Sequence, residues 1–257
     1  MSLEEHLTSL VDLHCHVLPG VDDGAADLDV SLRMLQLAQD DGVRLVAATP
    51  HAHRSNLLEI PELVARLNAS AAEAGLEVRV VPGQEVRIGA HVAQRVRQGD
   101  LLTLNGTRYL LLELPLFGEW PSYVTEVVRE LLAEQVQPIL AHPERYPDVQ
   151  RNPELVRPLV EMGVPVQINA DSLGERAERG ARPAAEYLLT RRMAHLIASD
   201  SHSDRWRPPG LAAAFRRAAE LAGPEYAAWM AGAAWQVIRD APLALPSPGA
   251  EVGDTRE

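Results

Sequence analysis

This sequence contains little cysteine, no long apolar run and no basic patch. One cysteine among 257 residues, Cys15, excludes an intrachain disulfide framework and suits a reducing compartment. No apolar run approaches the roughly 20 residues that span a membrane. The first ten residues, MSLEEHLTSL, carry two glutamates where a secretory signal would carry basic residues. We therefore expect a cytoplasmic protein without membrane insertion.

The chain is also short of positive charge. Its formal net charge is −12, with 36 acidic residues against 24 basic ones. A surface that binds nucleic acid usually shows a basic stripe. Here the arginines are scattered or lie on helical faces such as FRRAAE, where solvation accounts for them. We expect no nucleic-acid partner, and a nuclease is disfavoured as the function.

What the sequence does contain is a regular alternation of short apolar runs with amphipathic segments. The amphipathic segments predict helices over residues 27–42, 60–75, 121–135 and 152–163. Runs rich in Val, Leu and Ile predict strands over residues 9–14, 43–49, 76–81, 108–114, 137–141, 165–169 and 194–199. This alternation is typical of a parallel sheet and favours closure into a barrel, although an open doubly wound sheet has the same pattern.

The expected barrel takes up most of the chain as a single domain. No repeat or interior linker divides residues 1–241. Residues 242–257, PLALPSPGAEVGDTRE, are rich in Pro, Gly and acidic residues. Such a composition cannot bury enough apolar surface to order itself, so we expect a disordered tail.

Side chains that can bind metals follow nearly every predicted strand. Active sites of α/β barrels gather at the carboxyl ends of the strands. The first strand ends in HCH, and alternation sends His14 and His16 to the same side. Glu113, within LLLEL, is costly in apolar surroundings unless it is paired or coordinated. The candidate ligands are His14, His16, Asp23, His51, Glu85, Glu113, His142, Asp200 and His202.

The donor types limit the metals that this site could hold. Imidazole and carboxylate without thiolate suit Mn, Fe, Zn or Co and do not suit a structural zinc finger. Cys15 points to the other side of the strand from its histidine neighbours, so we interpret it as a small core residue. The set is large enough for two ions, or for three if one carboxylate bridges.

At these residues the sequence resembles the polymerase-and-histidinol-phosphatase (PHP) superfamily. The matching stretches are DLHCHVLPGVDDG, TPHAHR, GQEV, LLLELP, AHPERY, GERAERGARPAAEYLL and IASDSHSDRWRPP, which run from Asp12 to Pro209. AHPERY together with SDSH…RPP resembles one branch, the manganese-dependent protein-tyrosine phosphatases of bacterial capsule and exopolysaccharide systems. The resemblance implies an α/β fold consisting of a single distorted (β/α)7 barrel.

The same resemblance implies how the candidate residues are used. It implies three divalent ions, Mn first, with Fe, Zn or Co as alternatives. The implied ligands are His14, His16 and Asp200 for the first ion, Glu113 and His142 for the second with Glu85 bridging both, and Asp23, His51 and His202 for the third. Arg145 and Arg207 would bind the phosphate, because forked guanidinium donors match a tetrahedral anion. His53, Trp120 and Trp206 lie near these motifs without an assigned role.

The function implied by the resemblance is hydrolysis of phosphotyrosine by a metal-bridging hydroxide. The implied partner is the tail of a bacterial tyrosine kinase in capsule regulation. A phenolic leaving group, with a pKa of about 10, needs little help from a general acid. A cysteine-nucleophile phosphatase is excluded. Such an enzyme needs a Cys-x5-Arg loop, with arginine six positions after the cysteine, but the residue six positions after Cys15 is Val21. The alternatives are a small-molecule enzyme of the superfamily, such as histidinol-phosphate phosphatase, and a metal-binding scaffold without catalysis.

Overall fold

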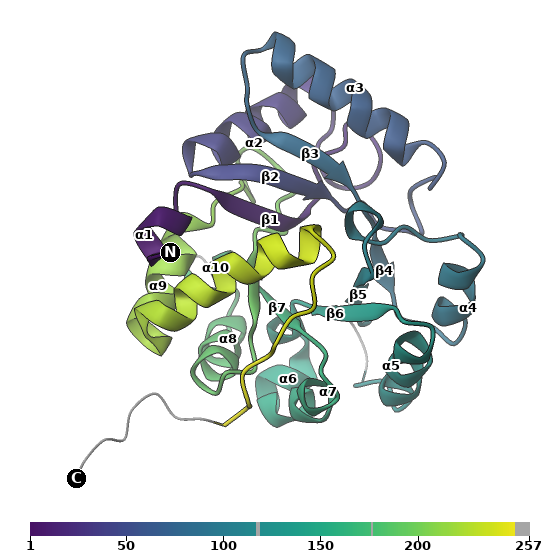
Figure 1. The fold of residues 1–257 in the computed structure, drawn as a ribbon, viewed down its shortest axis with the longest axis vertical. Helices are drawn as coiled ribbons and strands as arrows, with labels where there is room; N and C mark the ends of the chain where they lie inside the picture. Colours follow the sequence, from purple (N-terminus) through teal and green to yellow (C-terminus); the bar gives the residue numbers. More distant parts are fainter. Residues whose placement is uncertain (117–118, 176, 250–257) are drawn as a thin grey trace.

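Parallel strands surrounded by helices make up the protein (Figure 1). The computed structural model describes residues 1–116, 119–175 and 177–249. Within these residues the strands form two parallel sheets, in the orders β1-β2-β3 and β4-β5-β6-β7-β8. The strands are β1 (Leu10–Cys15), β2 (Val43–Ala48), β3 (Arg79–Pro82), β4 (Glu85–Arg87), β5 (Tyr109–Glu113), β6 (Gln137–Ala141), β7 (Val166–Asn169) and β8 (Leu196–Ala198).

The α/β class with parallel strands is thus confirmed, whereas one closed barrel sheet is not. The chain changes sheet between β3 and β4, which only Gly83 and Gln84 separate. A Cβ on Gly83 would lie 2.9 Å from Leu104 Cδ2, so glycine permits this close approach. Within the described residues, two isolated bridges connect the sheets: Cys15 of β1 with Ser201, which follows β8, and His51, which follows β2, with Glu85 of β4.

Helices lie between and around the strands. They are α1 (Leu3–His6), α2 (Leu28–Asp40), α3 (Ile60–Glu73), α4 (Val92–Arg97), α5 (Val124–Ala133), α6 (Pro147–Arg151), α7 (Arg157–Glu161), α8 (Ala181–Thr190), α9 (Ala212–Ala222) and α10 (Pro224–Ile238). Short 3-10 helices are η1 (Leu104–Gly106), η2 (Pro143–Arg145), η3 (Pro153–Val156) and η4 (Asp171–Leu173). No helix in the described part of the chain combines the length and the apolar character needed to cross a membrane.

The predicted helices form for the expected reasons, with one exception. In α2, Asp27 accepts a hydrogen bond from the Val30 amide at 2.9 Å, and Met34, Leu35 and Ala38 form the buried face. The single helix predicted over 152–163 is wrong. The structure has η3 followed by α7, because the segment contains Pro158, which lacks an amide hydrogen for a helical bond.

The amino ends of the strands are closed by α10, which crosses in front of them in Figure 1. Ala233, Val237 and Ile238 of α10 join an apolar cluster that includes Leu13 of β1 and Tyr109 of β5. A larger cluster fills the space between the sheets and the outer helices. Of the predicted tail, residues 250–257 lie outside the described residues, while Leu243 packs against the α10 cluster. The domain boundary at 241 stays a prediction.

Candidate metal centre

Strand β1 ends by directing two imidazoles into the interior. His14 and His16 are fully buried, and their Nε2 atoms lie 3.2 Å apart. Their Nδ1 atoms are hydrogen-bonded elsewhere, that of His14 to Gln167 Oε1 at 3.0 Å and that of His16 to Asp22 Oδ2 at 2.7 Å. A hydrogen bond at one ring nitrogen orients the other toward a metal, as is usual for ligating histidines. Both Nε2 atoms therefore face the same small space.

Buried carboxylates from the second sheet border that space. Asp200, which follows β8, places Oδ1 3.3 Å from His14 Nε2. Glu85, the first residue of β4, places Oε1 3.5 Å from His14 Nε2 and Oε2 3.5 Å from His16 Nε2. Glu113, the last residue of β5, is also buried. The predicted donors therefore converge from two sheets: Asp200 and Glu113 lie at the carboxyl ends of their strands, whereas Glu85 lies at the start of β4.

The backbone is constrained at two of these donors. His142 has a φ of 34° and Asp200 a φ of 50°, both in the left-handed region. Residues other than glycine adopt it at a cost of roughly 1–3 kcal/mol, and such conformations cluster at functional sites. In this conformation His142 places Nε2 2.9 Å from Glu85 Oε1.

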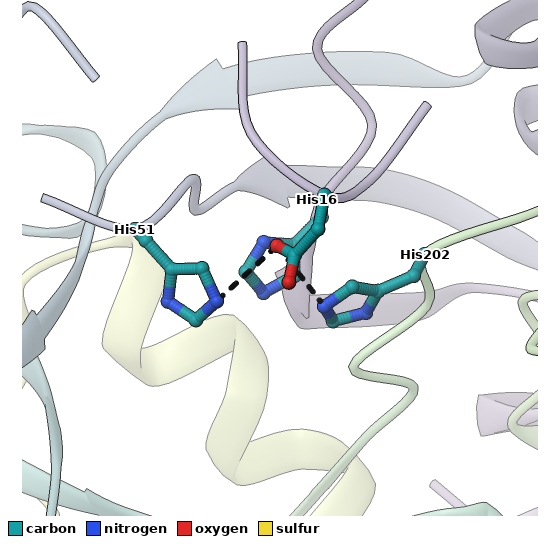
Figure 2. Close-up of side chains that lie close together, drawn as sticks. His16, His51 and His202 are labelled. Carbon is teal, nitrogen blue, oxygen red and sulfur yellow. Dashed lines mark ion pairs between the residues drawn. The ribbon is translucent and has the colours of Figure 1, made fainter. Parts of the chain in front are cut away.

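A further group of donors lies at the edge of the space. Figure 2 shows the rings of His16, His51 and His202 converging. Asp23 Oδ1 lies 3.4 Å from His51 Nε2 and 3.9 Å from His202 Nε2. Asp23 is about half exposed, so this group is the most accessible part of the centre.

The structure brings all nine predicted ligands together. Among the described residues there are four sets in which the donor atoms of a set all lie within 4.8 Å of one another: His16–Asp23–His51–His202, His14–His16–Glu85, His14–His142–Asp200 and His51–Glu85–Glu113. The first set contains the three residues that the resemblance implies for one ion. The other sets group the donors differently from the implied assignment, placing Glu113 with His51 rather than with His142. The role of each ligand stays a prediction.

The donor set fits divalent cations on its own chemistry. His51 Nδ1 and Glu85 Oε2 lie 2.7 Å apart. Both atoms are buried, yet neither has a hydrogen-bond partner of acceptable geometry among the described residues. Buried polar atoms without partners are costly and uncommon. A cation bound among these oxygen and nitrogen atoms would compensate them, and borderline metals accept both donor types.

The protonation of the centre follows from its crowding. Burial lowers the pKa of His16, but the Asp200 and Asp22 carboxylates outweigh burial and raise it to about 10. Burial and the neighbouring Glu85 raise the pKa of Glu113 to about 7. Without cations, protons on His16 and Glu113 offset the negative charge of the buried carboxylates. A bound cation offsets the same charge, so cation binding must release protons.

Both predicted arginines face the same carboxylate. Arg145 of η2 donates from Nη1 to Asp200 Oδ2 at 3.2 Å, and Arg207 pairs with the same oxygen through Nη2. The Arg207 Nε is buried, and no residue in the described part of the chain forms a hydrogen bond with it. Both arginines line a cavity of about 160 Å³ together with His142, Glu85 and other candidate ligands. Two forked cations therefore border the donor cluster.

A buried polar network supports the donors and includes residues that sequence reasoning missed. Asn169 donates from Nδ2 to Asp200 Oδ2 at 2.8 Å, and Gln167 donates to Asn169 Oδ1 at 2.9 Å. Glu144 accepts from the Asn169 amide at 2.7 Å and from the Ser172 hydroxyl at 2.8 Å. Gln167 and Glu144 were missed, as was Asp22 beside Asp23. For Gln167 the available signal was a polar residue inside the apolar strand PVQIN.

The residues without an assigned role lie at different distances from the centre. The His53 ring is 5.2 Å from the His51 ring. Trp206 is 67% exposed, lines the donor cavity and lies 5.9 Å from the His202 ring. Trp120 packs against the main core instead. Contact of either tryptophan with a substrate ring stays a prediction.

Comparison with known proteins places this arrangement in a family. Residues 10–235 match the family model described as "Capsular polysaccharide synthesis, CpsB/CapC". The chain belongs to the CpsB/CapC family. The resemblance seen in the sequence is thereby confirmed, and membership of the PHP superfamily is consistent with it.

Relatives in the CpsB/CapC family are named tyrosine-protein phosphatases. YwqE of Bacillus subtilis is 34% identical over 202 residues, which cover 77% of this chain and 79% of that protein. CpsB of Streptococcus agalactiae serotype III is 28% identical over 217 residues, covering 80% and 88%. A solved structure, from work on YwqE and Streptococcus pneumoniae CpsB as "unique metal-dependent tyrosine phosphatases", matches with a TM-score of 0.89. Its identity is 30%, with 95% of this chain and 100% of that chain covered.

Proposed function

We propose that this CpsB/CapC-family protein is a metal-dependent phosphatase that hydrolyses phosphotyrosine in proteins. The observation that carries the proposal is the meeting of Arg145 and Arg207 with the donor cluster in one cavity. Hydrolysis of a phosphate monoester needs cations that bind a dianion and groups that neutralise charge in the transition state. Relatives named tyrosine-protein phosphatases support phenolic esters as the substrate.

We propose that the nine predicted ligands hold three divalent ions, with Mn as the first choice and Fe, Zn or Co as alternatives. When bound, such ions supply Lewis acidity toward a phosphoryl group and lower the pKa of water to near neutrality. The pairing of His14 with Gln167 and of His16 with Asp22 supports this role, because it fixes both rings with Nε2 toward the cavity.

The arginines would orient the phosphoryl group. Arg145 and Arg207 now share Asp200 Oδ2, and a phosphoryl dianion would offer them further acceptors. The Nε of Arg207, which has no hydrogen-bond partner among the described residues and lies 4.0 Å from Asp171 Oδ2, adds a donor for such an anion. A positioned pair of guanidinium groups neutralises charge on the equatorial oxygens as the ester bond breaks. A tyrosyl leaving group, with a pKa of about 10, departs without a dedicated acid.

We also propose that the two sheets are parts of one distorted seven-stranded barrel. In this interpretation β3 and β4 are the halves of one strand that bends at Gly83. The isolated bridges at Cys15–Ser201 and His51–Glu85 would then be the seams of the barrel. The interpretation is supported by amide hydrogen bonds across both seams, from His16 to Ser201 O at 2.8 Å and from Ala52 to Glu85 O at 2.9 Å.

The proposed protein substrate is the tail of a bacterial tyrosine kinase in the cytoplasm. The match to a capsular polysaccharide synthesis family supports a substrate protein from such a system. The single cysteine, which is buried and unpaired, is compatible with a reducing compartment.

The test compares metal-loaded and metal-free protein on a phosphotyrosyl peptide. We expect hydrolysis with Mn to fall to background after complete chelation and to return when Mn is restored. Activity that survives complete metal removal would contradict the proposal. A panel with histidinol phosphate and other alkyl phosphates addresses the small-molecule alternative, which predicts higher kcat/KM for the alkyl esters. Arg145→Lys, which keeps the charge and removes the fork, should lower kcat on every ester.

A further inference from the structure

A second, larger cavity adjoins the candidate metal centre. Its volume is about 440 Å³, against about 160 Å³ for the cavity of the donors. Cavities of roughly 300–1,000 Å³ are typical of sites that bind small molecules or side chains. Trp206 and Arg207 line both cavities, so the two share a wall. The rest of its lining comes from residues 170–175 after β7, from Ser199 after β8, from Pro208 and Gly210, and from the start of α9.

The lining of this second cavity is mostly apolar. Ala170, Leu173, Pro208 and Ala213 contribute hydrocarbon surface, and Trp206 adds an indole. Trp206 is 67% exposed, which leaves a large apolar surface uncovered at the shared wall. Exposed apolar surface of this kind, next to a cleft, commonly marks a place where a partner is bound.

The charged residues that line the second cavity are two carboxylates and Arg207, which is already paired with Asp200. Asp171 and Glu175 line it, and both residues are exposed. Asp171 Oδ2 lies 4.0 Å from Arg207 Nε, so this acidic side meets the wall shared with the donor cavity. Carboxylates beside an apolar lining favour an uncharged or basic group and oppose an acidic one.

We infer that this second cavity, which we call the flanking-residue cavity, binds an apolar side chain that neighbours the phosphotyrosine in the substrate protein. The inference rests on the proposed function. It names a substrate feature, an apolar residue beside the phosphotyrosine, and it assigns to Asp171 and Glu175 the rejection of acidic residues at that position.

The phosphotyrosine ring itself fits the donor cavity better than the flanking-residue cavity. The ring is bonded directly to the ester oxygen, so a phosphate between Arg145 and Arg207 keeps the ring near them. Leu116 and Trp206 supply apolar surface in that same cavity. A residue next to the phosphotyrosine in the substrate, by contrast, would lie beyond Trp206 and Arg207, in the flanking-residue cavity.

The experiment measures kcat/KM of Mn-loaded protein on phosphotyrosyl peptides. The two residues on each side of the phosphotyrosine are changed, one at a time, to Phe, Gly or Glu. At one position we expect Phe to exceed Gly roughly tenfold, since partial burial of an aromatic side chain is worth that factor. Glu at that position should be the poorest of the three. p-Nitrophenyl phosphate, which has no flanking residue, serves as the reference substrate.

Ala213→Phe is designed to fill the flanking-residue cavity from α9. Ala213 is exposed, so the new ring enters the cavity without displacing core residues. We expect the preference for Phe over Gly to shrink to less than about twofold, while p-nitrophenyl phosphate hydrolysis changes far less. Ala72→Phe, an exposed alanine on α3, is the matched control and should keep the preference. Glu175→Gln should reduce the difference in kcat/KM between the peptides that carry Gly and those that carry Glu beside the phosphotyrosine.

The outcomes separate the inference from the proposed function. If no phosphotyrosyl ester is hydrolysed with any metal, the proposed function fails and the inference fails with it. If all peptides are hydrolysed equally well by the wild type, the function stands and the inference is overturned. It is also overturned if Ala213→Phe keeps the preference for Phe. Equal losses on the peptides and on p-nitrophenyl phosphate would overturn it too, because the cavity would then hold the ester's own ring.

Discussion

The two ends of the strands differ in what they bury. At the amino ends, α10 packs Val237 and Ile238 against Leu13 and Tyr109, all apolar or nearly so. At the carboxyl ends, the same strands lead into buried imidazoles and carboxylates such as His14 and Glu113. Burial of apolar surface stabilises the first end, while the second carries the desolvation of charged groups. Substitutions at the amino ends should therefore change mainly the stability, and substitutions at the carboxyl ends should change mainly the proposed activity.

The largest effect is expected from Asp200→Asn at the carboxyl ends. Asparagine tolerates the left-handed conformation at this position, so the fold should be retained. The change replaces a candidate carboxylate ligand by a neutral amide and removes the negative charge that pairs with both arginines. We expect kcat on p-nitrophenyl phosphate to fall roughly 1,000-fold, as is usual when metal and electrostatic stabilisation are lost. Thermal unfolding of the same sample checks the fold, and an active Asn variant would contradict the assignment.

A smaller effect is expected from Asn169→Ala in the network beneath the donors. Asn169 holds Asp200 Oδ2 and is bonded to Gln167, which orients His14. Loss of such supporting contacts typically weakens metal binding roughly 10- to 100-fold. Titration of Mn into metal-free protein measures the change. If kcat at saturating Mn recovers, Asn169 acts by positioning the metal ligands. An unchanged Mn affinity would show that Asn169 does not support metal binding.

At the opposite end, Val237→Ala should affect stability alone. Val237 is fully buried in α10. Removing two methyl groups there should cost roughly 2 kcal/mol of unfolding free energy, including the cavity left behind. Denaturant unfolding measures this cost. The activity per folded molecule should match the wild type, and a loss of activity without a loss of stability would break the contrast between the two ends.

The smallest effect is a pH dependence of stability from His195, which precedes β8. Burial lowers the pKa of His195 to about 3, and its Nδ1 accepts a hydrogen bond from the Val166 amide at 3.1 Å. The unfolded state therefore binds a proton that the folded state excludes. Above a pH of about 6.5, His195 is neutral in both states and does not change the free energy of unfolding. Below a pH of about 6.5, the free energy of unfolding falls by up to roughly 1.4 kcal/mol per pH unit.

His195→Asn keeps an acceptor near the Val166 amide and removes the titration. The variant should therefore lose less stability than the wild type when denaturant unfolding is compared at pH 7 and at pH 5. Equal losses in the two proteins would assign the pH dependence to other groups.

The sequence allowed the positions of strands and candidate ligands to be predicted, because both depend on local patterns. Val-, Leu- and Ile-rich runs locate the strands, and each ligand follows one of them. The break at Gly83 was missed, because a change of sheet depends on which strand the chain meets next. Gln167 and Glu144 were missed for a similar reason. Their role is defined by partners such as Asn169, whose proximity is set by the folded chain.

The grouping of donors was likewise beyond the sequence. Spacing in HCH predicts that His14 and His16 share a side, and the structure agrees. Nothing local indicates that Glu113 lies with His51 rather than with His142. Such distances depend on how strands of the two sheets approach one another.

The isolated bridges between the sheets lie beside donors, at His51–Glu85 and next to His16 at Cys15–Ser201. Each of the four donor sets combines residues from the strands of both sheets or from the segments that follow those strands, as His51 with Glu85 and Glu113 does. A cation in such a set would act as a reversible cross-link between the two halves of the molecule, in a chain that has one thiol and no disulfide. Supply of metal would then govern how firmly the halves are joined as well as whether the protein is active.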